Sequence, residues 1–146
     1  MPDIENPSGP TIVPGSYGVD LSIDGKTQSA SFAVVKDPRL STTAADYAAQ
    51  FALHMELVSY LSKLKVVVNR LRTIKRQLGE AAQRAGKGQR GPKSRANALV
   101  ERLSAIESIL VDPKRKSARD VLRNPAGLND TLLDMIAMTT IADAAP

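Results

Sequence analysis

The chain has 146 residues, a net charge of +5 and an apolar fraction of 42%, which is enough for one ordinary domain or two small ones. It contains no cysteine, which excludes disulfide bonds, thiolate metal sites and cysteine nucleophiles. No apolar run is long enough to span a membrane as a helix, and the first twenty residues lack the pattern of a signal peptide.

The first predicted element is a β-hairpin between Pro14 and Arg39. Apolar residues alternate with small or polar ones on both sides of the pair Asp24-Gly25, which supplies the two positive-φ positions of a tight hairpin turn. An isolated two-stranded hairpin is marginally stable in water, so we expect this one to require a partner. The residues expected on its inward face are Tyr17, Val19, Leu21, Phe32 and Val34.

A long helix is predicted next, from the cap residues Ser41–Thr43 to about Ala85. Thr43 and Asp46 have the spacing of a capping box. A helix of this length predicts a coiled-coil-like hairpin with a returning segment, and we expect side chains near its start to cover the hairpin. The covering candidates are Tyr47, Phe51 and Met55, and the seam candidates are Phe51, Leu57, Leu61, Leu64, Val68, Leu71, Ile74, Leu78 and Ala82.

The returning segment is predicted as a second helix that Ser94 caps and Pro113 ends. A basic, glycine-rich loop from Arg84 to Arg95 separates it from the first helix. A third helix is expected from Leu128 to about Ala142. We expect the seam to form within one chain, with self-association through the same seam as the alternative. The apolar positions expected to return along the first helix are Leu99, Leu103, Ile106 and Leu110.

These patterns predict an α+β fold. A short antiparallel β segment over residues 1–40 is followed by a helical hairpin or bundle over residues 41–146, comprising a long antiparallel helical hairpin and a shorter third helix.

Basic residues are concentrated between Lys63 and Arg123, which carry seventeen of the twenty basic groups. Such a run can bind a polyanion through sequence-independent phosphate contacts. No aromatic residue interleaves with these charges to stack on bases, and acidic residues are interspersed, so nucleic acid is the less favoured partner. The candidate polyanion contacts are Arg84, Lys87, Arg90, Lys93 and Arg95.

Three other patterns have features of chemical sites. Asp20 and Asp24 are four residues apart on one strand and no third catalytic group accompanies them, so we interpret them as solvated surface residues. His54 is the only histidine, and without ligand partners at helical spacing it is interpreted as a side chain on the flank of the helix or a packed one. The stretch Gly86–Lys93 has phosphate-loop spacing, but Pro92 removes a backbone N–H group and a helix precedes it. We therefore expect no catalytic, cofactor-binding or metal-binding residue.

Four motifs carry a resemblance to a known family. Gly9-Pro10, Pro14 to Tyr17, Asp24 to Lys26 and Asp37 to Arg39 resemble the C-terminal region of bacterial sortilin-like proteins with BNR (Asp-box) repeats, often labelled glycosyl hydrolases. In that family a β-propeller precedes an immunoglobulin-like segment and a helical hairpin. The Asp-box itself does not occur here, and the chain has no tryptophan to complete one.

The resemblance implies that the hairpin is the last part of an immunoglobulin-like sandwich. It implies a non-catalytic accessory module that packs on the parent β-propeller or binds another protein through its helical arm. It also implies a secreted or periplasmic parent, and the compartment of this chain stays open. The alternatives are a basic helical protein that binds nucleic acid or an anionic surface, and a fragment of a hydrolase whose active site lies in the propeller.

Overall fold

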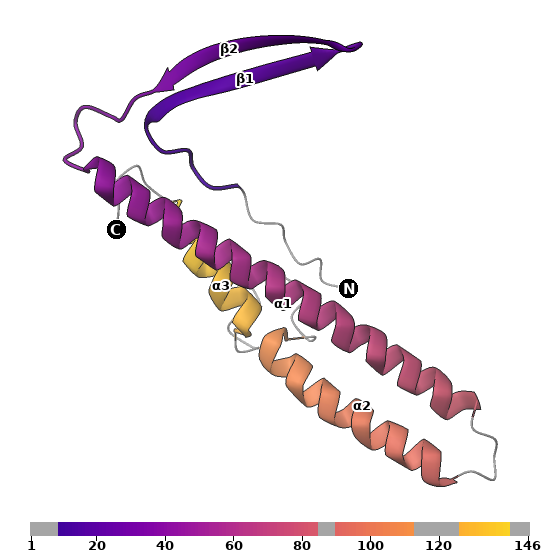
Figure 1. Ribbon diagram of the computed structural model, residues 1–146. Helices are drawn as coiled ribbons and strands as arrows, with labels where there is room; N and C mark the ends of the chain where they lie inside the picture. Colours follow the sequence, from indigo (N-terminus) through magenta and orange to yellow (C-terminus); the bar gives the residue numbers. More distant parts are fainter. Residues whose placement is uncertain (1–8, 85–89, 113–125, 141–146) are drawn as a thin grey trace. The chain divides into compact units, whose positions relative to one another are not determined.

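The computed structural model of the chain describes residues 9–84, 90–112 and 126–140. Two strands, β1 (Gly15–Ile23) and β2 (Lys26–Val34), are followed by three helices, α1 (Ala44–Arg84), α2 (Arg90–Leu110) and α3 (Leu128–Met138). Helix α1 packs against α2 and α3 (Figure 1). The predicted α+β fold is thereby confirmed.

The two strands form an antiparallel hairpin with the predicted turn. Tyr17 lies opposite Phe32 and Val19 opposite Ala30, so the apolar residues of both strands share one face. Asp24 and Gly25 have φ angles of 50° and 76°, the conformation of a two-residue type I′ turn. Asp24 therefore belongs to the turn, and its predicted place on the strand beside Asp20 was wrong.

Helix α1 begins at the predicted capping box. The Thr43 amide donates to Asp46 Oδ2 at 2.8 Å, and the Asp46 amide donates to Thr43 Oγ1 at 3.2 Å. This reciprocal pair satisfies two backbone donors that a helix start leaves unpaired. The helix then continues without interruption for 41 residues.

The chain divides into two compact units, which are described separately. One contains Ser59–Asp134 and the other contains Pro7–Val58 with Met135–Pro146. The domain boundary at residue 40 stays a prediction.

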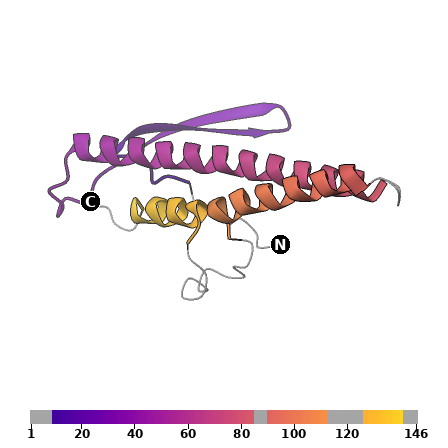
Figure 2. The same ribbon diagram turned by 90° about the horizontal axis from the view of Figure 1, so that it is seen from below.

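In the first unit, α2 runs antiparallel beside the later part of α1 (Figures 1 and 2). Five apolar residues of α1 form the buried face predicted for it, and α2 contributes a small apolar residue and a charged one. The buried residues of these two helices are Leu61, Leu64, Val68, Leu71, Ala82, Ala96 and Glu107.

The predicted apolar stripe of α2 was wrong at two of its four positions. Leu99 and Ile106 are 45% and 49% exposed, and the residues that follow them, Val100 and Glu107, turn inward. Ile74 of α1 is exposed in the same way. The sequence pattern favoured the apolar residue Ile106 for the inward position. In the structure the next residue, Glu107, takes this position because Arg72 and Lys75 of α1 bind its carboxylate.

The start of α2 and the end of α3 also differ from the prediction. Helix α2 begins at Arg90 and not after Ser94, because proline is tolerated in a first turn, where the amide has no intrahelical partner. Helix α3 ends at Met138, not near Ala142. The hydroxyls of Thr139 and Thr140 bond back to the carbonyls three residues earlier and compete with continued helix.

The second unit contains the hairpin, the beginning of α1 and the end of α3. Leu57 and Ile136 are its buried apolar residues, and three polar residues are buried with them. These polar residues are Thr42, His54 and Thr139.

The predicted cover of the hairpin by α1 extends only to the end of β2. Tyr47 and Phe51 line a pocket together with Val34 and Val35, but Val19, Leu21, Ile23 and Phe32 remain about half exposed or more. Met55 is 45% exposed and is not part of that lining. Among the described residues, no helix is long and apolar enough to cross a membrane.

Candidate functional site

The hairpin has one apolar and one polar face, and the apolar face is open to solvent. Val19, Leu21 and Ile23 of β1 are 51%, 58% and 60% exposed, and Phe32 of β2 is 48% exposed. The Tyr17 and Phe32 rings stack with centroids 5.9 Å apart. On the polar face, the hydroxyls of Ser22 and Thr27 are 2.8 Å apart. Strand pairing thus leaves a row of apolar side chains without cover from the described residues.

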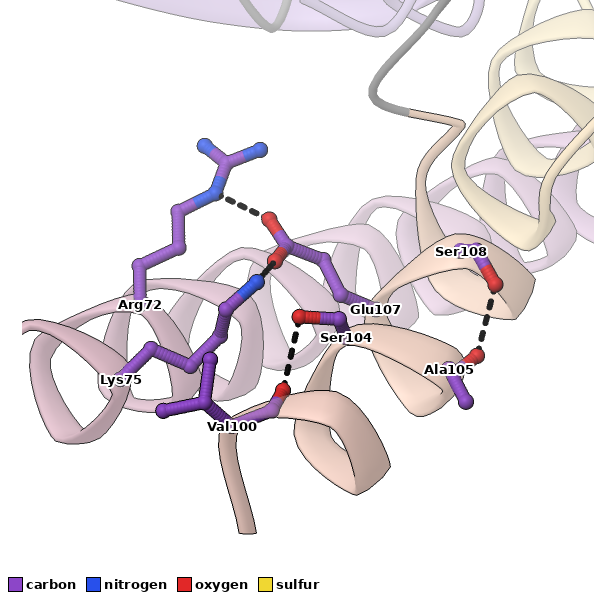
Figure 3. A network of polar contacts seen from close by, with 7 residues as sticks. All are labelled: Arg72, Lys75, Val100, Ser104, Ala105, Glu107 and Ser108. Carbon is purple, nitrogen blue, oxygen red and sulfur yellow. Dashed lines mark hydrogen bonds and ion pairs between the residues drawn. The ribbon is translucent and has the colours of Figure 1, made fainter. Parts of the chain in front are cut away.

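A buried carboxylate joins α2 to α1. Arg72 Nε donates to Glu107 Oε1 at 2.7 Å and Lys75 Nζ donates to Glu107 Oε2 at 2.9 Å (Figure 3). Burial alone raises the pKa of Glu107, but the hydrogen bonds and the charges of the two cations outweigh it and hold this pKa below its ordinary value. The cluster is a satisfied structural contact between helices and leaves no oxygen of Glu107 without a donor.

The structure describes the side chains of three of the five predicted polyanion contacts, and it does not show these three as one cluster. Arg84 ends α1, and Lys93 and Arg95 lie exposed in the first turns of α2. Lys87 lies outside the described residues, as does the side chain of Arg90, which begins α2. Earlier in the basic run, Arg72 and Lys75 are paired with Glu107, and Arg76 is paired with Glu80. Part of the positive charge is therefore neutralised within the helices.

The first part of the stretch with phosphate-loop spacing, Gly86 to Gln89, lies outside the described residues. Its remaining part, with Gly91 and Pro92, lies in the first turn of α2.

Of the two predicted placements of His54, on a helix flank or packed, the structure has the packed one, and Thr139 contacts one of its ring nitrogens. The residue is 2% exposed, and its Nδ1 lies 2.7 Å from Thr139 Oγ1. Thr139 Oγ1 itself donates to the Ile136 carbonyl at 2.7 Å, while the Thr139 carbonyl accepts a hydrogen bond from Gln50. Burial lowers the pKa of His54 because it disfavours the charged ring. The imidazole is therefore neutral at physiological pH.

The other ring nitrogen of His54 has no hydrogen-bond partner among the described residues. His54 and Thr139 line a pocket of about 190 Å³ within the second unit. Most of the lining is apolar and comes from the segment before β1, the end of β2 and the first turns of α1. No group of three His, Cys, Asp or Glu side chains that could hold a metal ion occurs in residues 9–84, 90–112 and 126–140.

Sequence reasoning missed the partner of His54, because Thr139 is 85 residues away in the chain. The one available signal was a stripe in the third helix, where Leu132, Ile136 and Thr139 are spaced four and three residues apart and so share one helix face. That stripe shows that Thr139 faces inward but does not identify what it contacts.

Comparison of the chain with protein-family models, with curated protein sequences and with solved structures found no match.

Proposed function

We propose that this chain is a non-catalytic accessory module that binds a β-rich partner through the apolar face of its hairpin. The observation that carries the proposal is the exposure of Val19, Leu21, Ile23 and Phe32, which lie together on one face of two paired strands. A contiguous exposed apolar face typically marks an interaction site. The partner that fits best is a β-sheet, because it can cover this face and pair with the open edges of the ribbon.

The resemblance to sortilin-like BNR-repeat proteins suggests which sheet this is. In that architecture the hairpin would pack on the parent β-propeller or on the preceding strands of an immunoglobulin-like sandwich. Any glycoside hydrolysis would then belong to the propeller and not to this chain. At the end of β2, Lys36 donates hydrogen bonds to the carbonyls of Leu40 and Thr42, which orders the connection between the hairpin and α1.

Site-specific photocrosslinking tests the proposal. A photoreactive phenylalanine analogue placed at Leu21 reports on the apolar face, and the same analogue at Ser22 reports on the polar face one residue away. We expect the Leu21 probe to crosslink, in cells that produce the protein, to a polypeptide containing a β-propeller or β-sandwich. The Ser22 probe should give much less of the same product.

A competing substitution supplies the control. Leu21→Lys should abolish the crosslink from a probe at Val19, whereas Ser22→Lys should leave it in place. The proposal is wrong if both faces crosslink equally, if no crosslink forms, or if the only product is a second copy of this chain.

A further inference from the structure

Helices α1 and α2 each carry a second row of apolar residues beside the buried seam. Val67 and Ile74 of α1 are seven residues apart, as are Leu99 and Ile106 of α2, and all four are between 38% and 51% exposed. Each directly precedes a residue that faces further into the seam. A spacing of seven residues keeps a row on one side of a helix, so the four exposures follow one pattern.

The two rows lie on the same side of the helix pair. Helices α1 and α2 are antiparallel neighbours (Figures 1 and 2), and in such a pair the positions that directly precede the inward rows point to one common side. Glu107 of α2 bonds to both Arg72 and Lys75 of α1, which places Ile106 close to the level of Ile74. One apolar face therefore forms, the α1–α2 flank, which consists of Val67, Ile74, Leu99 and Ile106.

Cations border the α1–α2 flank. A basic residue stands four positions before each of its apolar residues, one turn earlier on the same helix. All four cations are exposed, and none forms an ion pair with another described residue. Lys63 also lies over the Tyr60 ring, 5.4 Å from its centroid. The bordering cations are Lys63, Arg70, Arg95 and Arg102.

The acidic residues of the same helix segments do not neutralise this border. Glu80 and Glu107 are already paired with other cations of α1. Glu101 lines a pocket with residues of α2 that do not belong to the flank. The flank thus combines an apolar centre with positive edges, which is complementary to a helix that has an apolar stripe with negative edges.

This combination fits other occupants less well. A second copy of the chain would set positive edges against positive edges, which is unfavourable. A nucleic acid would pair with the cations but leave the apolar centre uncovered. A lipid surface takes up apolar side chains that project from a helix, whereas those of the flank are about half covered.

We propose that the α1–α2 flank binds an acidic amphipathic helix of another protein, which completes a three-helix bundle. The apolar stripe of that helix packs on the four apolar residues, and its carboxylates pair with the bordering cations. Tyr60 extends the apolar row of α1, and the row from Tyr60 to Ile74 spans about 21 Å of helix, which a partner helix of about 15 residues covers. The flank lies wholly within the first unit and is separate from the apolar face of the hairpin.

Two synthetic peptides test the proposal on the full chain. Both are about three heptads long with the same leucine stripe, and one carries glutamate and the other lysine on both sides of the stripe. Each is labelled with fluorescein and titrated at physiological ionic strength, with fluorescence anisotropy as the readout. We expect the glutamate peptide to bind about tenfold more tightly, because like charges repel the lysine peptide. Amide chemical shifts should change along the α1–α2 flank.

A substitution at the centre of the flank has a matched control one residue away. Ile106→Glu places a carboxylate in the apolar centre and should weaken binding of the glutamate peptide about tenfold. Ala105→Glu adds the same charge at an exposed position that points to another side of α2. It should change the affinity by less than about twofold, because solvent and salt screen the added charge. Circular dichroism and thermal melting report whether each variant is folded.

Charge reversal gives a readout that loss of folding does not mimic. In the double variant with Arg70→Glu and Arg102→Glu the border becomes partly negative, so the lysine peptide should bind more tightly than the glutamate peptide. Arg76→Glu makes the same kind of change on another side of α1, where Arg76 pairs with Glu80, and it should keep the preference for the glutamate peptide. Unfolding would weaken both peptides and would not exchange their order.

Equal affinity for the two peptides in the unaltered protein would overturn the proposal, as would the absence of binding at millimolar concentration or shifts confined to the hairpin. Displacement of the glutamate peptide by duplex DNA or by phosphatidylserine vesicles at physiological ionic strength would overturn it in favour of a nucleic acid or a membrane. A dimer in sedimentation that Ile106→Glu dissociates would overturn it in favour of a second copy. These results leave the crosslinking result of the hairpin unaffected, so the two proposals fail independently.

Discussion

Arg72 of α1 and Glu107 of α2 are 35 positions apart in the chain and meet through a hydrogen bond of 2.7 Å from Nε to Oε1. The Glu107 side chain is 8% exposed, and that of Arg72 is 23% exposed. A carboxylate that is so deeply placed between two helices is stable only while cations satisfy it. We therefore expect the stability of the first unit to be especially sensitive to substitutions in this contact.

Glu107→Ala should lower the free energy of unfolding by about 1–3 kcal/mol, because Arg72 and Lys75 lose their buried acceptor but can still turn partly towards water. Ile106→Ala is the matched control. Since Ile106 is 49% exposed, its loss should cost less than about 1 kcal/mol. Urea denaturation of the two variants measures both values. A larger effect at Ile106 would favour the apolar stripe predicted from the sequence over the observed packing.

The seam of α1 should contribute more to stability than the hairpin. Leu64 is buried, so Leu64→Ala should cost about 2–4 kcal/mol. Leu103 is only partly buried, so Leu103→Ala should cost less than Leu64→Ala. Val19 is 51% exposed, and Val19→Ala should cost less than about 1 kcal/mol. Denaturation curves of the three variants test the order, and equal losses at Val19 and Leu64 would show that the hairpin shares a core with the helices.

His54 should make stability depend on pH near neutrality. Its pKa is lower in the folded chain than the ordinary value of 6.5, so the unfolded chain binds the proton more readily. The contribution of the neutral ring is fully present above about pH 6.5 and is lost as the pH falls towards the lowered pKa. The other titratable residues that line its pocket are Lys36, Asp37 and Tyr47. The free energy of unfolding should decrease from pH 7 to 5 in the parent protein.

In His54→Phe this decrease should be smaller, whereas Glu107→Gln should leave it unchanged. The pKa of Glu107 is also lowered, from 4.5, so its contribution is present above about pH 4.5 and is lost only in more acidic solution. A His54→Phe variant with the same slope between pH 7 and 5 as the parent would contradict the assignment to His54.

The turn of the hairpin should be sensitive at Gly25. Its φ of 76° lies in the left-handed region, where a side chain is strained. Gly25→Ala should therefore destabilise the hairpin locally by about 1 kcal/mol, while Asp24→Asn should be tolerated because asparagine adopts this conformation. Hydrogen exchange of the β1 and β2 amides is the measurement. Faster exchange confined to the strands of the Gly25 variant is the expected result.

Polyanion binding should be weak and independent of sequence. The exposed cations Arg84, Lys93 and Arg95 can contact phosphates, but Arg72, Lys75 and Arg76 are already paired with glutamates. Retention on DNA at low salt should disappear near physiological ionic strength. A complex that survives this salt concentration, or prefers one sequence, would favour the nucleic-acid alternative.

The sequence predicted elements better than it predicted which residues face inward. The turn at Asp24-Gly25 and the capping box at Thr43 depend on neighbouring residues, and both were confirmed. The helix seam depends on contacts between distant residues. At Ile106 the apolar side chain was expected inside, but the neighbouring glutamate takes that place because cations of α1 reach it.

The pocket could not be predicted for a related reason. Its lining combines residues before β1, residues after β2, the start of α1 and Thr139, and no local pattern links these segments. The sequence did show that His54 lacks ligand partners at helical spacing. It could not show that one ring nitrogen is bonded to Thr139 and that the other has no partner in the part of the chain that the structure describes.

The Glu107 cluster also determines how far one helix can slide along the other. The buried leucines and the one buried valine of α1 recur with a spacing close to seven residues, so apolar contacts alone tolerate a displacement by one heptad. The carboxylate does not, because only the observed alignment offers it two cations, and a buried polar residue in a seam is an established means of fixing alignment. Displacement by one heptad in either direction would set Glu107 against Lys65 and Val68, or against Gly79 and Ala82.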